Sequence, residues 1–200
     1  MQLLAQPWWV NLLIVVPIVV GWFWRARPLN ISLRQLGWAA AFAGAFGFVE
    51  AAVVVYLRAA SGLLPGYQGT LADVVRLAGT PYRQDQVALP PSLLTVEVFR
   101  EAATILMLVA VAMLAARVAR ERWAAFLWCF AIWDTAYYTG LWATIRWPQS
   151  LTTADVLFLI PVPWIAQVWF PLLMDAAVVA AVLCSRRPRA AITRTRAWAA

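Results

Sequence analysis

The sequence predicts an all-α integral membrane protein, a bundle of five transmembrane helices with an external or re-entrant half-helix before the last span. Hydrophobic residues make up 64% of the 200 residues and charged residues only 12%, which is unlike a soluble domain. Five apolar runs have about the length that a hydrocarbon core of roughly 30 Å requires. Arginines cluster at alternate ends of these runs. We expect residues 1–200 to form a single membrane domain.

The first two spans are predicted over residues 7–24 and 36–59. Pro7–Trp24 has no positively charged stretch before it and no small-residue cleavage site after it, which favours a transmembrane helix over a signal peptide. Pro17 predicts a bend in this helix. The second span carries small residues that let membrane helices approach closely, namely Ala39, Ala43, Gly44 and Gly47.

Residues 60–91 are predicted to lie outside the membrane. Thr70 and Asp73 have the spacing of a capping box, which indicates a short amphipathic helix within this segment. The third and fourth spans are predicted over residues 92–116 and 123–145. Arg117, Arg120 and Arg122 lie in the short connection between them.

The last apolar stretch, residues 150–184, is too long for one span. As a single helix it would measure roughly 50 Å, against a hydrocarbon core of about 30 Å. Pro161, Pro163 and Pro171 interrupt it. We therefore expect an external half-helix over residues 152–160, a proline turn, and a fifth span over residues 164–184.

The arginines predict the orientation of the chain in a cell (inner) membrane. Eleven of them fall on one predicted side, at residues 25, 27, 34, 117, 120, 122, 186, 187, 189, 194 and 196, and five on the other, at residues 58, 76, 83, 100 and 146. Because basic residues accumulate on the cytoplasmic side of membrane proteins, we expect the N-terminus outside and the C-terminus in the cytoplasm. The net charge of +7 is thus attributed to the arginines that orient the chain in the membrane, and no nucleic-acid partner is expected.

The sequence contains no histidine, which limits the cofactor sites and catalytic groups that it can form. It removes the usual haem ligands, the common zinc ligands and the most frequent general base. No cofactor is expected, and no metal site is predicted. Cys129 and Cys184 are expected to stay reduced near the cytoplasmic side.

Carboxylates on three predicted spans fall in the same outer half of the membrane. Glu50 precedes Arg58 by eight residues, which places it about 12 Å inside the outer boundary. Asp134 follows Arg122 by twelve residues and reaches about the same depth. Glu97 lies near the outer edge and Glu101 one turn deeper. Since charged groups are costly against lipid, we expect these side chains to point into the bundle.

These considerations predict an outward-facing polar pocket, with candidate residues Glu50, Glu97, Arg100, Glu101, Asp134, Tyr137, Tyr138, Arg146 and Asp155. A structural interpretation stays open for several of them. Glu97, Arg100 and Glu101 could form an ion-pair network at a helix start, and Arg146 and Asp155 could belong to a loop and a helix cap. Asp175, near the midplane, could belong to an ion path or bond to a neighbouring helix.

Three functions are compatible with this pattern. The first is proton- or cation-coupled transport, or solute binding, at the acids. The second is a non-catalytic subunit or assembly factor of a larger membrane complex, whose partners would be other membrane subunits besides the lipid bilayer. The third is an enzyme acting on a lipid-linked substrate, with an acid as general base and Arg100 or Arg146 holding a phosphate. Enzymatic activity is the least favoured, because the sequence supplies no nucleophile motif.

Overall fold

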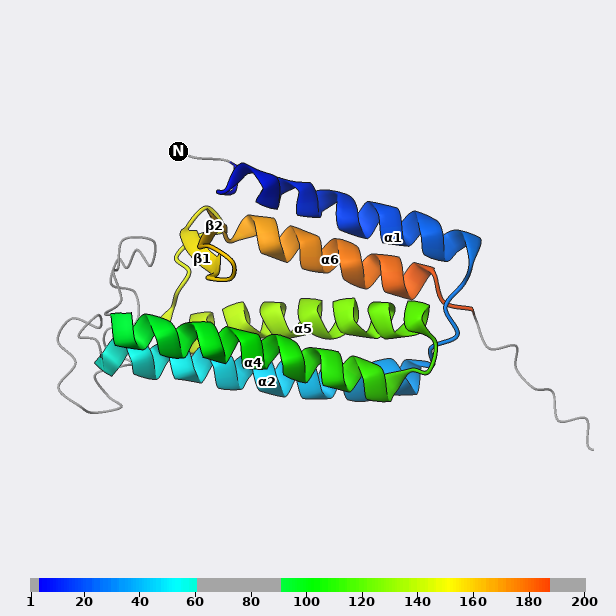
Figure 1. Cartoon of the computed structure of the whole chain (residues 1–200), viewed down its shortest axis with the longest axis horizontal. Helices are drawn as coiled ribbons and strands as arrows, with labels where there is room; N and C mark the ends of the chain where they lie inside the picture. The colour runs from blue at the N-terminus through cyan, green and yellow to red at the C-terminus, as the bar shows by residue number, and fades with distance from the viewer. Residues whose placement is uncertain (1–3, 61–90, 188–200) are drawn as a thin grey trace, which may run out of the picture.

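The computed structural model describes residues 4–60 and 91–187, and these are mostly helical (Figure 1). The elements in chain order are the 3₁₀ helix η1 (Trp8–Ile14), α1 (Val15–Ala26), α2 (Leu33–Ala60), α4 (Pro91–Ala115), α5 (Ala119–Ile145), β1 (Ala154–Phe158), β2 (Trp164–Gln167) and α6 (Trp169–Cys184). The long helices run alternately in opposite directions. In Figure 1, α1 and α6 form one layer and α2, α4 and α5 the other, and α5 packs against α6 to join them.

Among the described residues, three helical segments are long and apolar enough to cross a membrane: Trp8–Ala26, Leu33–Ala59 and Pro91–Ala115. α6 is apolar but has only 16 residues, fewer than the roughly 20 that a span normally needs. α5 has 27 residues, but its first turn contains Arg120, Glu121 and Arg122 and its middle contains Asp134. Of the five predicted spans, the first three coincide with candidate membrane-spanning helices.

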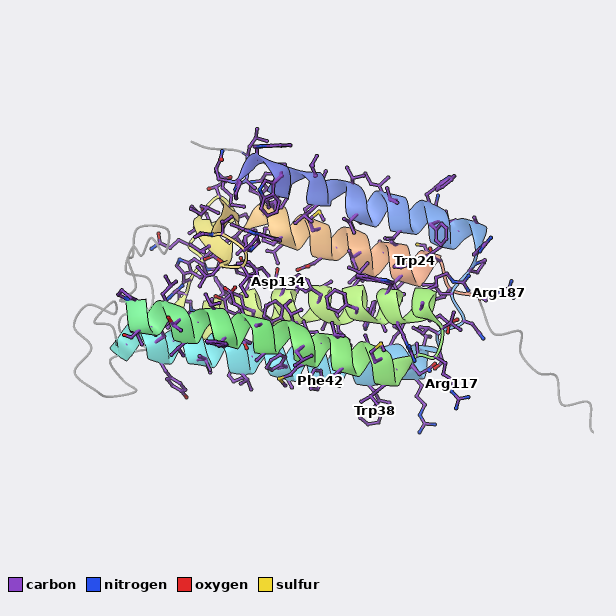
Figure 2. All side chains as sticks on the ribbon, in the orientation of Figure 1. Trp24, Trp38, Phe42, Arg117, Asp134 and Arg187 are labelled. Atoms are coloured by element: carbon purple, nitrogen blue, oxygen red, sulfur yellow. The ribbon has the colours of Figure 1, made fainter. Side chains whose placement is uncertain are left out.

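Large apolar side chains cover the outer surface of the helices. Trp38 on α2 is 71% exposed and points away from the bundle, whereas Trp24 on α1 is buried (Figure 2). Trp22 and Leu114 are also exposed. Soluble proteins rarely present contiguous apolar surface of this kind, so the outer surface is compatible with a membrane location.

The predicted half-helix over residues 152–160 is wrong. β1 and β2 pair antiparallel, so this segment is the first half of a β-hairpin, and the helix predicted from residue 164 begins only at Trp169. Pro161 and Pro163 lie in the loop between the strands, where their missing N–H groups remove no bond from the ladder. The N-terminal segment extends the hairpin, since Gln6 and Ile165 exchange two backbone hydrogen bonds of 2.8 Å.

The N-terminal span begins as η1 and continues as α1. Pro17 lies in the first turn of α1, just after the 3₁₀ helix ends at Ile14. Asn11 fixes the start of η1, because its side-chain oxygen accepts from the Ala5 N–H at 2.9 Å and its side-chain nitrogen donates to the Trp8 carbonyl at 2.8 Å.

Small residues set the contact between α2 and α5. Ala39, Ala43 and Ala51 are buried at four-residue spacing with Gly47 between them, so they form one stripe along α2. A Cβ on Gly47 would collide with the Trp133 carbonyl oxygen. Close packing was predicted for this region and is confirmed at Gly47. Gly44 differs, because a Cβ there would meet nothing within 4 Å.

Residues 61–90 of the predicted connection over residues 60–91, with its capping-box helix, and the arginines beyond residue 187 lie outside the described residues. The helices on either side of the connection end at Ala60 and begin at Pro91, close to the predicted bounds.

Candidate functional site

Arg100 joins acids from two helices near the hairpin end of the bundle. Its guanidinium forms an ion pair with Glu50 of α2 and donates two hydrogen bonds, of 2.9 and 2.7 Å, to Oε2 of Glu97. The Thr104 hydroxyl donates to the other oxygen of Glu50 at 2.7 Å. The predicted i+3 contact between Glu97 and Arg100 is present. Glu50, Glu97 and Arg100 thus form one network in which each charge has a partner.

The predicted inward face of α4 is confirmed. Glu97, Glu101, Thr104 and Leu108 are all buried, as their three- and four-residue spacing indicated. Glu101, however, does not join the Arg100 network through a hydrogen bond among the described residues. Its two carboxylate oxygens accept from the Leu159 N–H of the hairpin loop, at 3.1 and 2.8 Å. Glu101 therefore holds the hairpin against α4.

Tyr138 and Asp155 form a second anchor for the hairpin. The Tyr138 hydroxyl of α5 donates to Oδ2 of Asp155 at 2.7 Å, and the Val156 N–H donates to its Oδ1 at 2.8 Å. Both side chains are buried. Tyr137 packs its ring between Trp133 and Tyr138, with centroid distances of 6.3 and 5.2 Å.

Two further arginines of the described residues, Arg146 and Arg58, contact aromatic rings. Arg146 ends α5 with a positive φ of 52°, and its guanidinium lies 4.5 Å from the ring centroid of the exposed Trp142. Arg58 was not among the predicted site residues, because the sequence marked it only as a helix end. It is buried, with its guanidinium 4.4 Å from the Trp147 ring centroid.

Asp134 meets Asp175, an acid that the sequence left without a partner. Asp134 lies on the side of α5 that faces α6, in the half of the bundle nearer the hairpin (Figure 2). Its carboxyl group is within hydrogen-bonding reach of the Asp175 carboxyl on α6. The Thr135 hydroxyl also donates to Asp175, at 3.1 Å. Both acids are at least nine-tenths buried, with relative exposures of 9% and 5%.

Asp134 and Asp175 line a cavity of about 580 Å³. Residues of α5 and α6 line it together with Ala102 and Ile105 of α4 and with Leu13 and Val16 of the N-terminal span. The hairpin covers one end through residues of both strands. Among the described residues that line this cavity, the two aspartates are the only ionisable ones. Its size lies within the 300–1,000 Å³ that small-molecule sites usually occupy.

The structure therefore distributes the predicted pocket residues over the Arg100 network, the hairpin anchors and the cavity, and Arg146 lies apart from all three, against Trp142. Of the predicted set, only Asp134 lines the cavity. No group of three or more acids or cysteines within residues 4–60 and 91–187 is arranged to hold a metal ion. No known protein family, curated protein or solved structure matches the chain.

Proposed function

We propose that this chain is a multi-pass membrane protein of five spans that binds an apolar solute in the cavity beside Asp134. The number of spans is supported by the alternating helix directions, since each long helix connects the hairpin end to the opposite end (Figure 1). The orientation is supported by the arginines. The described arginines of the α1–α2 and α4–α5 connections and directly after α6 lie together at one end, where Figure 2 labels Arg117 and Arg187. That end faces the cytoplasm on the positive-inside rule.

The observation that carries the proposed function is an apolar cavity with a buried acid in its wall. The cavity walls are built from leucine, valine, isoleucine, methionine and aromatic side chains, which suit an apolar solute. Burying the carboxyl group of Asp134 in such apolar surroundings costs free energy. A ligand site explains why an acid stands there, because a few polar groups in an apolar wall fix the orientation of a bound solute.

The other acids favour a structural role. Glu50 and Glu97 share the guanidinium of Arg100, and Glu101 accepts from the hairpin backbone. Buried ionic groups with complete local partners are how membrane proteins tolerate charge. The proposed solute site therefore centres on Asp134 and Asp175.

Two neighbouring alanines on α4 offer a matched test of binding in the cavity. Ala102 and Ala103 are both exposed, but only Ala102 lines the cavity. The protein in lipid nanodiscs would be photolabelled with a neutral diazirine derivative of triphenylmethane, with and without excess unlabelled triphenylmethane. We expect saturable labelling of the α6 peptide containing Met174 and Val178. Ala102→Trp should abolish this saturable fraction, because the indole fills the cavity, and Ala103→Trp should leave it unchanged.

Two results would reject the proposed function. One is labelling of that α6 peptide that excess triphenylmethane does not reduce, which indicates lipid-facing labelling alone. The other is an equal response of the Ala102→Trp and Ala103→Trp variants. Circular dichroism and monodisperse elution of both variants establish that each has folded.

A further inference from the structure

Asp134 of α5 and Asp175 of α6 line the same cavity, and both are buried. A hydrogen bond between two carboxyl groups requires that one of them carry the proton, and Asp134 and Asp175 are within reach of such a bond. The buried Oδ2 of Asp134 has no hydrogen-bond partner in the structure of the described residues. With one shared proton, the pair carries a single negative charge, and that charge faces the cavity.

Among the described residues, the groups next to the pair are acidic or neutral. The charged groups that act on Asp134 are the carboxylates of Asp175 on α6 and Asp155 on β1. Asp175 is affected by Asp134 and by the neutral Thr135 hydroxyl. On α5, the hydroxyls of Tyr137 and Tyr138 are the other ionisable groups nearby.

The arginines of the neighbouring helices have other contacts. Arg100 of α4 is bound to Glu50 and Glu97, and Arg58 of α2 stacks on Trp147. Both act electrostatically on Tyr137. No arginine of the described residues lines the cavity.

An uncompensated negative charge in an apolar cavity is costly. It can be neutralised in two ways from the cavity side, by a second proton on the pair or by a bound cation. The two are mutually exclusive, because a second proton removes the charge that a cation would bind.

We propose that the solute is a lipophilic monocation, such as a protonated amine or a quaternary ammonium or phosphonium ion on an apolar body, and that it binds in exchange for the second proton of the pair. This inference rests on the proposed function. The apolar body contacts the cavity wall, and the cation lies beside Asp134. Phe130, Phe158 and Trp164 add aromatic faces, with ring centroids 5.9 Å apart for the first pair and 5.6 Å for the second, which favour a cation over a neutral group. The displaced proton passes to solvent.

The test compares ions of one shape and opposite charge. The full chain in nanodiscs of zwitterionic lipid would be titrated by calorimetry with tetraphenylphosphonium, with tetraphenylborate and with neutral triphenylmethane, and the signal of empty nanodiscs would be subtracted. We expect tetraphenylphosphonium to bind at least about tenfold more tightly than either of the other probes. Titrations in buffers of different ionisation enthalpy should show release of about one proton per cation bound at a pH where the pair is doubly protonated. Lower pH should weaken the binding of the cation.

Substitutions test whether cation binding and proton release depend on the pair of Asp134 and Asp175. Asp134→Asn should weaken tetraphenylphosphonium binding about tenfold or more and abolish the proton release. Glu121→Gln is the matched control, because it makes the same carboxylate-to-amide change on the same helix but in its first turn, away from the cavity, where Glu121 accepts from the Asn30 N–H at 3.1 Å. It should leave both quantities unchanged.

The wild-type titrations decide the inference even if Asp134→Asn does not fold. Equal binding of the cation and triphenylmethane, preference for the borate, or cation binding without proton release and without dependence on pH would each overturn it. If triphenylmethane still labels the cavity saturably in such a case, the proposed function stands and only the cationic ligand class fails. If neither probe responds to Ala102→Trp, the proposed function fails as well.

Discussion

Replacing Gly47 by alanine adds a single methyl group at the closest approach of α2 and α5. A Cβ at this position would collide with the Trp133 carbonyl oxygen and lie 2.9 Å from the Cβ of Ala136. The carbonyl belongs to the α5 backbone, so it cannot move aside by a rotamer change. The helices must separate or shift, and the buried stripe of small residues loses its contacts.

Gly44 provides the matched control on the same helix, because a Cβ there meets nothing within 4 Å. Both substitutions gain about 0.5–1 kcal/mol from the greater helix propensity of alanine. Only Gly47→Ala also incurs the cost of overpacking, typically 1–3 kcal/mol. We therefore expect Gly44→Ala to be neutral or stabilising and Gly47→Ala to be less stable than Gly44→Ala by about 1–3 kcal/mol.

The assay is reversible unfolding in mixed micelles, followed by circular dichroism as the fraction of denaturing detergent rises. The free energy of unfolding of the two variants is compared directly, so the shared propensity gain cancels. Equal stabilities would refute the close packing of α2 against α5 at Gly47.

Two further predictions concern the charges near the hairpin. Arg100→Leu leaves the buried Glu50 without its ion-pair partner and should lower the free energy of unfolding by about 3–5 kcal/mol. Arg146→Leu loses only an exposed ring contact and should cost about 0.5–1 kcal/mol, so equal losses in the two variants would contradict the Arg100 network. Glu101→Gln should speed amide hydrogen exchange at Leu159 about tenfold, because a charged acceptor is replaced by a neutral one. Unchanged exchange would show that Glu101 does not hold the hairpin.

Much of the helical arrangement could be predicted from local patterns. The apolar runs and their arginine ends locate α2 and α4 within a few residues, because helix bounds depend on nearby residues. The hairpin could not be predicted in the same way. Residues 154–158 are apolar and few, and short apolar runs do not distinguish a strand from a helix by periodicity. Their strand form depends on pairing with residues 164–167 and on the Glu101 contact, which is distant in sequence.

Contacts of the candidate site that lie within one helix could be predicted from the sequence. The Glu97–Arg100 pair follows from a spacing of three residues. Depth along a helix axis grouped Glu50 and Asp134 in one layer, but depth carries no information about the direction in which a side chain points. Glu50 faces α4 and Asp134 faces α6, so they belong to different sites. The partnership of Asp134 with Asp175 depends on how α5 and α6 pack.

The location of a bound solute tests the central claim most directly. Crystals of the protein grown from lipid would be soaked with a bromine-bearing triphenylmethane, and the anomalous signal would locate the bromine. The account predicts a peak inside the cavity, in contact with Ile105 of α4, Phe130 of α5 and Met174 of α6 and near the Asp134 carboxyl. Peaks confined to the outer, lipid-facing surface of the helices, with none in the cavity, would contradict it.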